Sequence, residues 1–118
     1  MKFTPAAEWQ SSWFQGETTV SYETLVKVFG PEHSVGDGYK VQAQWSLTFE
    51  DGTYATIYDW KEGDSYNGEG EGIPKEQVTC WHIGGTEALA VEYVVEAIAS
   101  YTKQPVECKE IKFIENNA

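Results

Sequence analysis

The chain has 118 residues, of which 41% are hydrophobic and 14% aromatic; this composition excludes a disordered chain and predicts one domain, residues 1–118. Nineteen acidic residues face eight lysines and no arginine, which gives a net charge of −11. Nucleic-acid affinity rests on basic contacts to phosphate, for which arginine is the preferred side chain. The totals therefore argue against direct nucleic-acid binding and favour a basic partner.

No segment has the length and apolar character of a signal peptide or a membrane span, so we expect a cytoplasmic protein without a membrane partner. Cys80 and Cys108 lack metal-binding spacing and predict reduced thiols, with a single disulfide as the alternative. No motif indicates a cofactor.

Two elements are predicted before residue 30. Residues 11–15 indicate a short strand that ends at Gly16, and Trp9 is expected to pack against the domain. A serine N-cap and a Gly-Pro stop bound a helix over about residues 22–29. Its apolar side chains share one side, so the helix should cover a sheet.

The centre of the predicted fold is a hairpin over about residues 40–60. Its first strand alternates apolar and polar side chains, as a strand with one buried face does. A two-residue turn would leave Ile57 on the polar side. A three-residue turn pairs Phe49 with Thr53 and places Trp45 opposite Ile57; we prefer it because burial sets the register.

This register places several aromatic side chains on the face away from the core. They become either a contact platform or a surface that another element covers. The side chains on this face are Tyr54, Thr56, Tyr58 and Trp60, beside Gln42, Gln44, Ser46 and Thr48.

Residues 61–75 predict a loop, ordered or mobile, that is rich in glycine and carboxylates. Its acids do not have the spacing of a calcium-binding loop, so no metal site is predicted. The loop is instead expected to engage basic side chains of a partner. Its acids are Glu62, Asp64, Glu69 and Glu71.

Residues 77–83 form a third predicted strand. Cys80 and His82 share one face and Trp81 the other, and the sequence leaves open which face is buried. A Cys–His pair invites nucleophilic chemistry, but no orienting acid or oxyanion hole accompanies it. We therefore predict no catalytic residue.

The glycines at 84 and 85 predict a tight turn, with Thr86 as N-cap of a helix over about residues 87–101. The segment after Pro105 alternates in the manner of a charged edge strand. Strands alternating with two helices in this order predict a two-layer α+β domain, with a mainly antiparallel sheet covered on one face by both helices.

The segments SYETLVKVFGP, DGYKVQAQW, FEDGTYATIYDWKEG and WHIGG occur in this order. They resemble a family of small proteins of bacteriophages and other large DNA viruses, over about residues 12–101. The resemblance implies a viral accessory protein made in a host cell, where such proteins often blunt host defence. It assigns no functional residue.

The composition and the resemblance together favour a non-enzymatic inhibitor that occupies a basic surface of a host protein. The predicted contact groups are the acids of the 61–75 loop together with Glu50 and Asp51 at the hairpin tip.

The alternative is a binder that sequesters a nucleotide-like signal. Aromatic rings would stack the base, lysines would meet phosphate and a histidine would donate a hydrogen bond. Such pockets often lie between subunits, so this alternative allows a homo-oligomer. Its residues are Lys40, Tyr54, Tyr58, Trp60, Lys61, Trp81 and His82.

An enzyme is the weakest hypothesis. Asp59 lies between two aromatic residues, where burial would raise the pKa of its carboxyl group. No second acid, nucleophile or metal set accompanies it at a suitable spacing.

Overall fold

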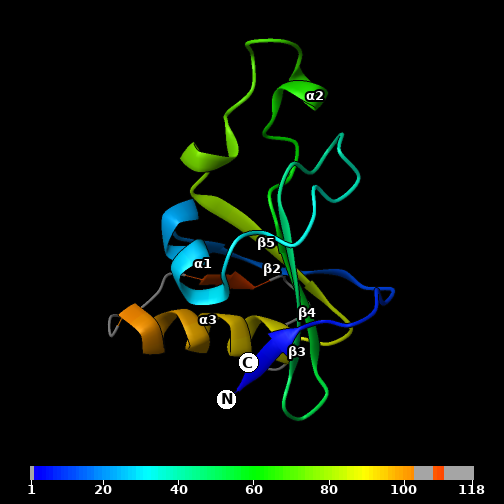
Figure 1. The fold of residues 1–118 in the computed structure, drawn as a ribbon, viewed down its shortest axis with the longest axis vertical. Coiled ribbons are helices and arrows are strands. Elements are labelled where there is room, and N and C mark those ends of the chain that lie inside the picture. Colours follow the sequence, from blue (N-terminus) through cyan, green and yellow to red (C-terminus); the bar gives the residue numbers. More distant parts are fainter. Residues whose placement is uncertain (1, 103–107, 111–118) are drawn as a thin grey trace.

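The computed structural model describes residues 2–102 and 108–110, which form one antiparallel sheet with helices on one side (Figure 1). The sheet has six strands in the order β1-β3-β4-β5-β2-β6. The strands are β1 (Phe3–Pro5), β2 (Trp13–Thr19), β3 (Gln44–Phe49), β4 (Tyr54–Tyr58), β5 (Cys80–Gly85) and β6 (Cys108–Glu110).

Two longer helices, α1 (Tyr22–Phe29) and α3 (Leu89–Thr102), lie on the same side of the strands in Figure 1. Two short ones, α2 (Asp64–Asn67) and the 3-10 helix η1 (Lys75–Gln77), belong to the segment that joins β4 to β5. The predicted two-layer α+β domain is confirmed. The bounds of α1 are those expected from its caps, since Ser21 Oγ accepts from the N–H of Thr24.

The central hairpin has the three-residue turn and the predicted register. The N–H of Phe49 donates to the carbonyl of Thr53 at 2.9 Å, and Trp45 pairs with Ile57. Gly52 takes a φ of 92°, a left-handed conformation that glycine adopts without strain. The register places Trp45, Leu47 and Ile57 in the core, each with no exposed surface.

The core settles which face of β5 is buried. Trp81 and Ile83 point inward, and the Trp81 ring meets that of Trp45 edge-on at 5.5 Å between centroids. The indole N–H of Trp81 donates to the carbonyl of Val20, so this polar atom is satisfied inside the core. His82 therefore points to the opposite face.

Two glycines expected to form a turn lie inside β5 instead. Gly84 pairs with Thr56 and Gly85 with Ala55, so the strand continues to residue 85. A Cβ atom on Gly85 would lie 2.7 Å from the Cβ of Ala90. Because Gly85 has no side chain, α3 can pack closely against β5. Helix α3 accordingly begins at Leu89, not at residue 87 after a Thr86 cap.

Strand β2 is longer than expected. It was predicted to end at Gly16, but it continues to Thr19, with a shift of register between Phe14 and Gly16. Such a bulge inserts one residue and keeps the pairing with β5 on either side.

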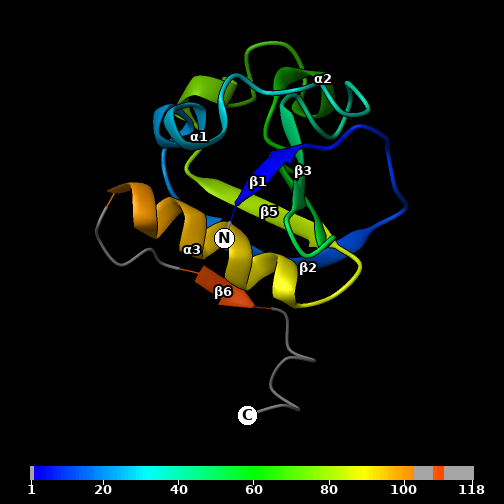
Figure 2. The ribbon, with the colours of Figure 1, turned by 60° about the horizontal axis from the view of Figure 1, so that its bottom comes forward.

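The sheet edges differ in how well the sequence predicted them. Strand β1 was not expected: it is short and contains a proline, which is tolerated at an edge. The Phe3 ring nevertheless anchors it, 5.1 Å from that of Phe29 and 5.9 Å from that of Phe49. At the other edge, β6 pairs with β2 (Figure 2), so the segment after Pro105 contains an edge strand, as predicted; its partner was not predicted. The predicted alternation of Ile111 and Phe113 lies outside the described residues.

Candidate functional site

The sheet face opposite α1 and α3 carries a cluster of rings built from three strands. Tyr58 of β4 pairs with His82 of β5, and both side chains point away from the core. The His82 ring stacks on Phe14 of β2 at 4.3 Å and on Trp60 at 6.0 Å, while Tyr58 meets it edge-on at 5.6 Å. We call Phe14, Tyr58, Trp60 and His82 the open-face ring cluster.

Two lysines extend over the exposed end of this cluster. The ammonium nitrogens of Lys40 and Lys61 lie 5.7 Å and 5.6 Å from the centre of the Trp60 ring, and that of Lys61 also lies 5.3 Å from the Tyr66 ring. These are cation–π distances. Among the described residues, neither ammonium group forms an ion pair with a carboxylate.

The backbone holds the two lysines in place. The N–H of Lys61 donates to the carbonyl of Lys40 at 2.7 Å, and Lys61 has a φ of 59°. Within the described part of the chain, no other non-glycine residue has a positive φ. The carboxylate of Asp37 accepts from three backbone N–H groups, those of residues 39, 40 and 41, and so orders the loop that presents Lys40.

A hollow of about 230 Å³ lies beside the ring cluster. Aromatic side chains, a few uncharged polar groups and the Asp37 carboxylate line it. Its walls include Trp9, Trp13, Tyr58, Trp60, Gln44 and Thr56. This combination of apolar rings and few polar groups is typical of small-molecule sites.

Only two members of the predicted ligand set, Tyr58 and Trp60, line the hollow. Lys40, Lys61 and His82 contact the Trp60 ring but are not among the walls of the hollow. Tyr54 and Trp81 do neither: both are fully buried, and Trp81 belongs to the helix-covered core. Both are therefore wrong as ligand-binding residues, and the predicted platform is open at Tyr58 and Trp60 but covered at Tyr54.

Sequence reasoning missed the contribution of the N-terminal segment. Trp9 was expected to pack against the domain, yet it is 77% exposed, and Trp13 is 57% exposed. Both line the hollow. Both tryptophans were visible in the sequence, but the position of Trp9, which precedes β2, depends on the β1–β3 pairing, which was not expected.

The environment of His82 makes its neutral form the favoured one. Burial among the rings lowers the pKa of the imidazole, and the nearby Glu17 carboxylate, 3.4 Å from Nε2, opposes this only in part. Cys80 lies two residues earlier on the same strand and is exposed. The described residues contain no cluster of His, Cys, Asp and Glu able to hold a metal ion.

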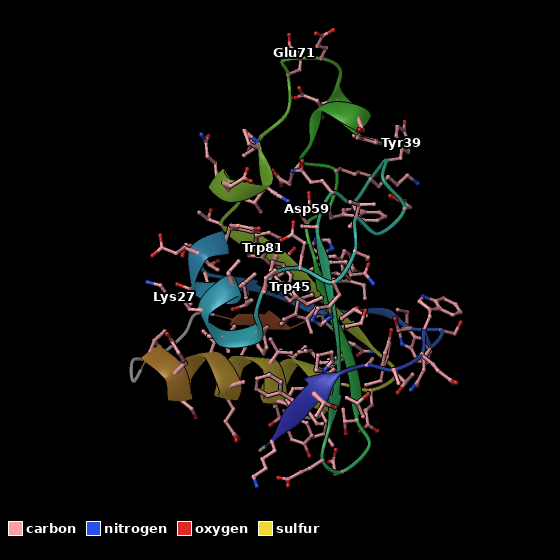
Figure 3. The ribbon with its side chains drawn as sticks, in the orientation of Figure 1. Lys27, Tyr39, Trp45, Asp59, Glu71 and Trp81 are labelled. Carbon is pink, nitrogen blue, oxygen red and sulfur yellow. The ribbon has the colours of Figure 1, made fainter. Side chains whose placement is uncertain are left out.

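The predicted acidic contact groups do not form one surface. Glu50 and Asp51 lie at the hairpin tip, at the bottom of Figure 1, whereas the segment with Glu71 lies at the top (Figures 1 and 3). Asp51 accepts from the Tyr93 hydroxyl at 2.7 Å and from the N–H of Thr53. Much of its hydrogen-bonding capacity is therefore used within the protein.

The acidic loop is also ordered by one of its own acids. Asp64 accepts from the N–H groups of Gly70 and Gly72, which lowers the pKa of its carboxyl group. Glu62 is half-buried, and burial followed by the charge of Asp59 raises its pKa. Glu69 and Glu71 are exposed. Of the predicted set in this loop, these two have the freest carboxylates.

Asp59 has a structural role that its position explains. It has no exposed surface, and its Oδ1 accepts from the N–H of Gln42 at 2.8 Å and of Ala43 at 3.0 Å. The side chain thereby replaces a strand partner at the end of the hairpin (Figure 3). The nearby acid is Glu62, whose pKa is raised by burial and by the charge of Asp59.

Comparison with family models, with curated proteins and with solved structures gives no match to this chain. None of the helices described here has both the length and the hydropathy needed to span a bilayer. The function must therefore be argued from the geometry.

Proposed function

We propose that this chain is a non-enzymatic binding protein and that the hollow beside Trp60 holds a small, planar, anionic ligand of nucleotide type. The observation that carries the proposal is the placement of Lys40 and Lys61 over one exposed tryptophan ring. Sequestering such a ligand would need no chemistry from the protein.

The placement of the two lysines is notable because the protein as a whole is strongly acidic. The chain has a net charge of −11, so its overall field repels anions. The ammonium groups of Lys40 and Lys61 lie over Trp60 without an ion-pair partner among the described residues, and they offset the negative charge of the Asp37 carboxylate in the same hollow. Such charges act over a Debye length of about 8 Å at physiological salt. An anionic group on the ligand has a favourable position there.

The rings supply the second half of the recognition. Stacking of a base on an aromatic side chain contributes about 1–3 kcal/mol per base. Trp60 is 37% exposed, and His82 supports its ring from below. The positive φ of Lys61 adds support, because local backbone strain is concentrated at binding and active sites.

Isothermal titration with a panel of mononucleotides, linear and cyclic, tests the proposal. We expect Trp60→Ala to abolish binding and the double change Lys40→Gln, Lys61→Gln to weaken it at least tenfold. Lys27→Gln is the matched control: it also removes a lysine charge, but from a residue on α1 that is paired with Glu23 and lies far from the hollow (Figure 3). Absence of binding across the panel would contradict the proposal, as would equal binding by the double variant and the control.

A second candidate is the viral accessory role, in which the protein inhibits a basic host protein in the host cytoplasm. The observation in its favour is that Glu69 and Glu71 are exposed on a loop that Asp64 holds in shape. We expect a partner recovered at low salt to be lost by Glu69→Gln with Glu71→Gln. Glu50→Gln, at the opposite end of the molecule, is the control. Retention of the partner by the loop variant would count against this role.

A further inference from the structure

The hollow beside Trp60 has a neighbour on the same face. A second hollow of about 490 Å³ lies between the N-terminal segment and the start of the hairpin, and Trp9 and Gln44 line both hollows. The remaining walls of the second hollow include Ala7, Glu8, His33, Ser34 and Ser46. The two hollows therefore adjoin along a shared wall.

The shared wall belongs to a segment that is tied to the sheet at its beginning. The N–H of Ala6 donates to the carbonyl of Ser46 at 2.8 Å, next to the β1–β3 pairing. Beyond Ala6 the chain crosses to β2 without helix or strand, on the side away from α3 (Figure 2). This crossing carries the exposed Trp9 ring between the two hollows.

The two hollows differ in size, about 230 Å³ at Trp60 and about 490 Å³ next to it. Pockets for small molecules and cofactors usually enclose about 300–1,000 Å³. The hollow at Trp60, at about 230 Å³, lies below that range and fits one ring unit. Joined to its neighbour it falls within the range.

The two hollows differ in the cations near them. Each has one carboxylate and no lysine among its walls, Asp37 in the first and Glu8 in the second, but the ammonium groups of Lys40 and Lys61 lie over the Trp60 ring of the first. His33 Nδ1 accepts the N–H of Ser46 at 3.0 Å, so a neutral His33 ring carries its proton on Nε2, where it can donate. Serine hydroxyls add further polar groups to the lining of the second hollow.

We infer that the two hollows form one groove for a two-unit ligand. The unit at Trp60 is a base with its phosphate, and the unit in the second hollow is an uncharged nucleoside held by hydroxyl and imidazole groups, with Trp9 between the two. The inference rests on the proposed function and specifies its ligand as a dinucleotide.

The test compares the binding of a dinucleotide with that of the corresponding mononucleotide. Adenosine 5′-monophosphate and the 5′-phosphorylated dinucleotide pApA are titrated separately into the full chain by calorimetry. We expect pApA to bind at least tenfold more tightly, with one molecule per chain. In Ala7→Trp the new side chain fills the second hollow, and the ratio of the two dissociation constants should fall to near one; Ala7→Ser is the control and should keep the ratio. Glu8→Gln should increase the ratio, because it removes a repulsion from the linking phosphate.

The outcomes separate the two proposals. If the mononucleotide binds and pApA binds no more tightly, or if Ala7→Trp keeps the advantage of pApA, the two-unit groove is wrong and the site at Trp60 stands. If neither compound binds but another mononucleotide of the panel does, the two-unit groove for pApA is wrong and the site at Trp60 stands; if nothing in the panel binds, both proposals are wrong.

Discussion

The backbone N–H of Lys61 donates to the carbonyl oxygen of Lys40 at 2.7 Å, so the two ends of the central hairpin are joined directly below the Trp60 ring. The same residue, Lys61, has a φ of 59°. The local backbone thus brings together two like charges that are far apart in the sequence, and it does so in a conformation that lysine does not favour.

The conformation of Lys61 predicts a difference between two substitutions that both remove its charge. Lys61→Gly should be more stable than Lys61→Ala by about 1 kcal/mol, because glycine adopts a positive φ without strain. Urea unfolding measures the difference. Both variants should bind the mononucleotide equally weakly, since neither has the ammonium group. Equal stability would show that the left-handed conformation carries no strain.

The buried Asp59 carboxylate predicts a large loss of stability when it is removed. Asp59→Ala leaves the N–H groups of Gln42 and Ala43 without an acceptor, at a cost of about 3 kcal/mol. Asp59→Asn keeps one acceptor oxygen and should lose roughly half as much. Chemical unfolding of both variants checks this order. A wild-type unfolding midpoint for Asp59→Ala would refute the structural role.

The lowered pKa of His82 predicts that stability depends on pH. The folded state binds a proton less readily than the unfolded state, whose histidine has a pKa of about 6.5. The free energy of unfolding should therefore be constant above this value and decrease as the pH falls below it. The groups that face His82 are Glu17 and Phe14 from β2, Tyr58 from β4, and Trp60, which follows β4.

His82→Phe provides the comparison, because it keeps a ring between Phe14 and Trp60 but cannot titrate. Unfolding at a series of pH values from 8 to about 5.5 should give a smaller decrease for the variant. Identical pH profiles would rule out a contribution from His82.

The hydroxyl of Tyr93 predicts a shifted titration at alkaline pH. Its hydrogen bond to Asp51, together with burial and nearby acids, raises its pKa to about 12. Asp51→Asn should bring the pKa back towards the ordinary value of about 10. NMR titration of the tyrosine ring carbons measures it. Glu92→Gln removes a weaker electrostatic interaction and should change the pKa of Tyr93 less. An equal change in the two variants would show that the surrounding negative charge, and not the hydrogen bond to Asp51, raises this pKa.

The sequence predicted the fold where a local pattern and burial agree. The register of the hairpin followed from the requirement that Trp45 face Ile57, and α1 followed from its two caps. Predictions failed where tertiary contact overrides local preference. Gly84 and Gly85 are typical of a turn, but they lie in β5. A Cβ atom at either position would lie too close to Thr56 or Ala90, so the packing of the strand requires glycine there.

The site was harder to predict than the fold for a related reason. Lys40, Trp60 and Lys61 lie near one another once the hairpin is known. Trp9 reaches the hollow only through the crossing of the N-terminal segment, which has no periodic pattern, and Trp13 reaches it as the first residue of β2, where this crossing ends. The excess of acidic residues was the strongest signal in the composition, but composition does not show where residues lie in the fold. The hairpin tip and the acidic loop lie at opposite ends of the molecule.

The bare backbone of Gly84 has a consequence for the shape of the open face. A Cβ atom there would lie 2.5 Å from the Thr56 hydroxyl and 3.4 Å from the Tyr58 ring, and both side chains line the hollow. Gly84 is not among the residues that line the hollow, yet the absence of its side chain sets how deep the hollow is. Even the methyl group of an alanine at residue 84 would displace the Thr56 and Tyr58 side chains towards the hollow and reduce its depth.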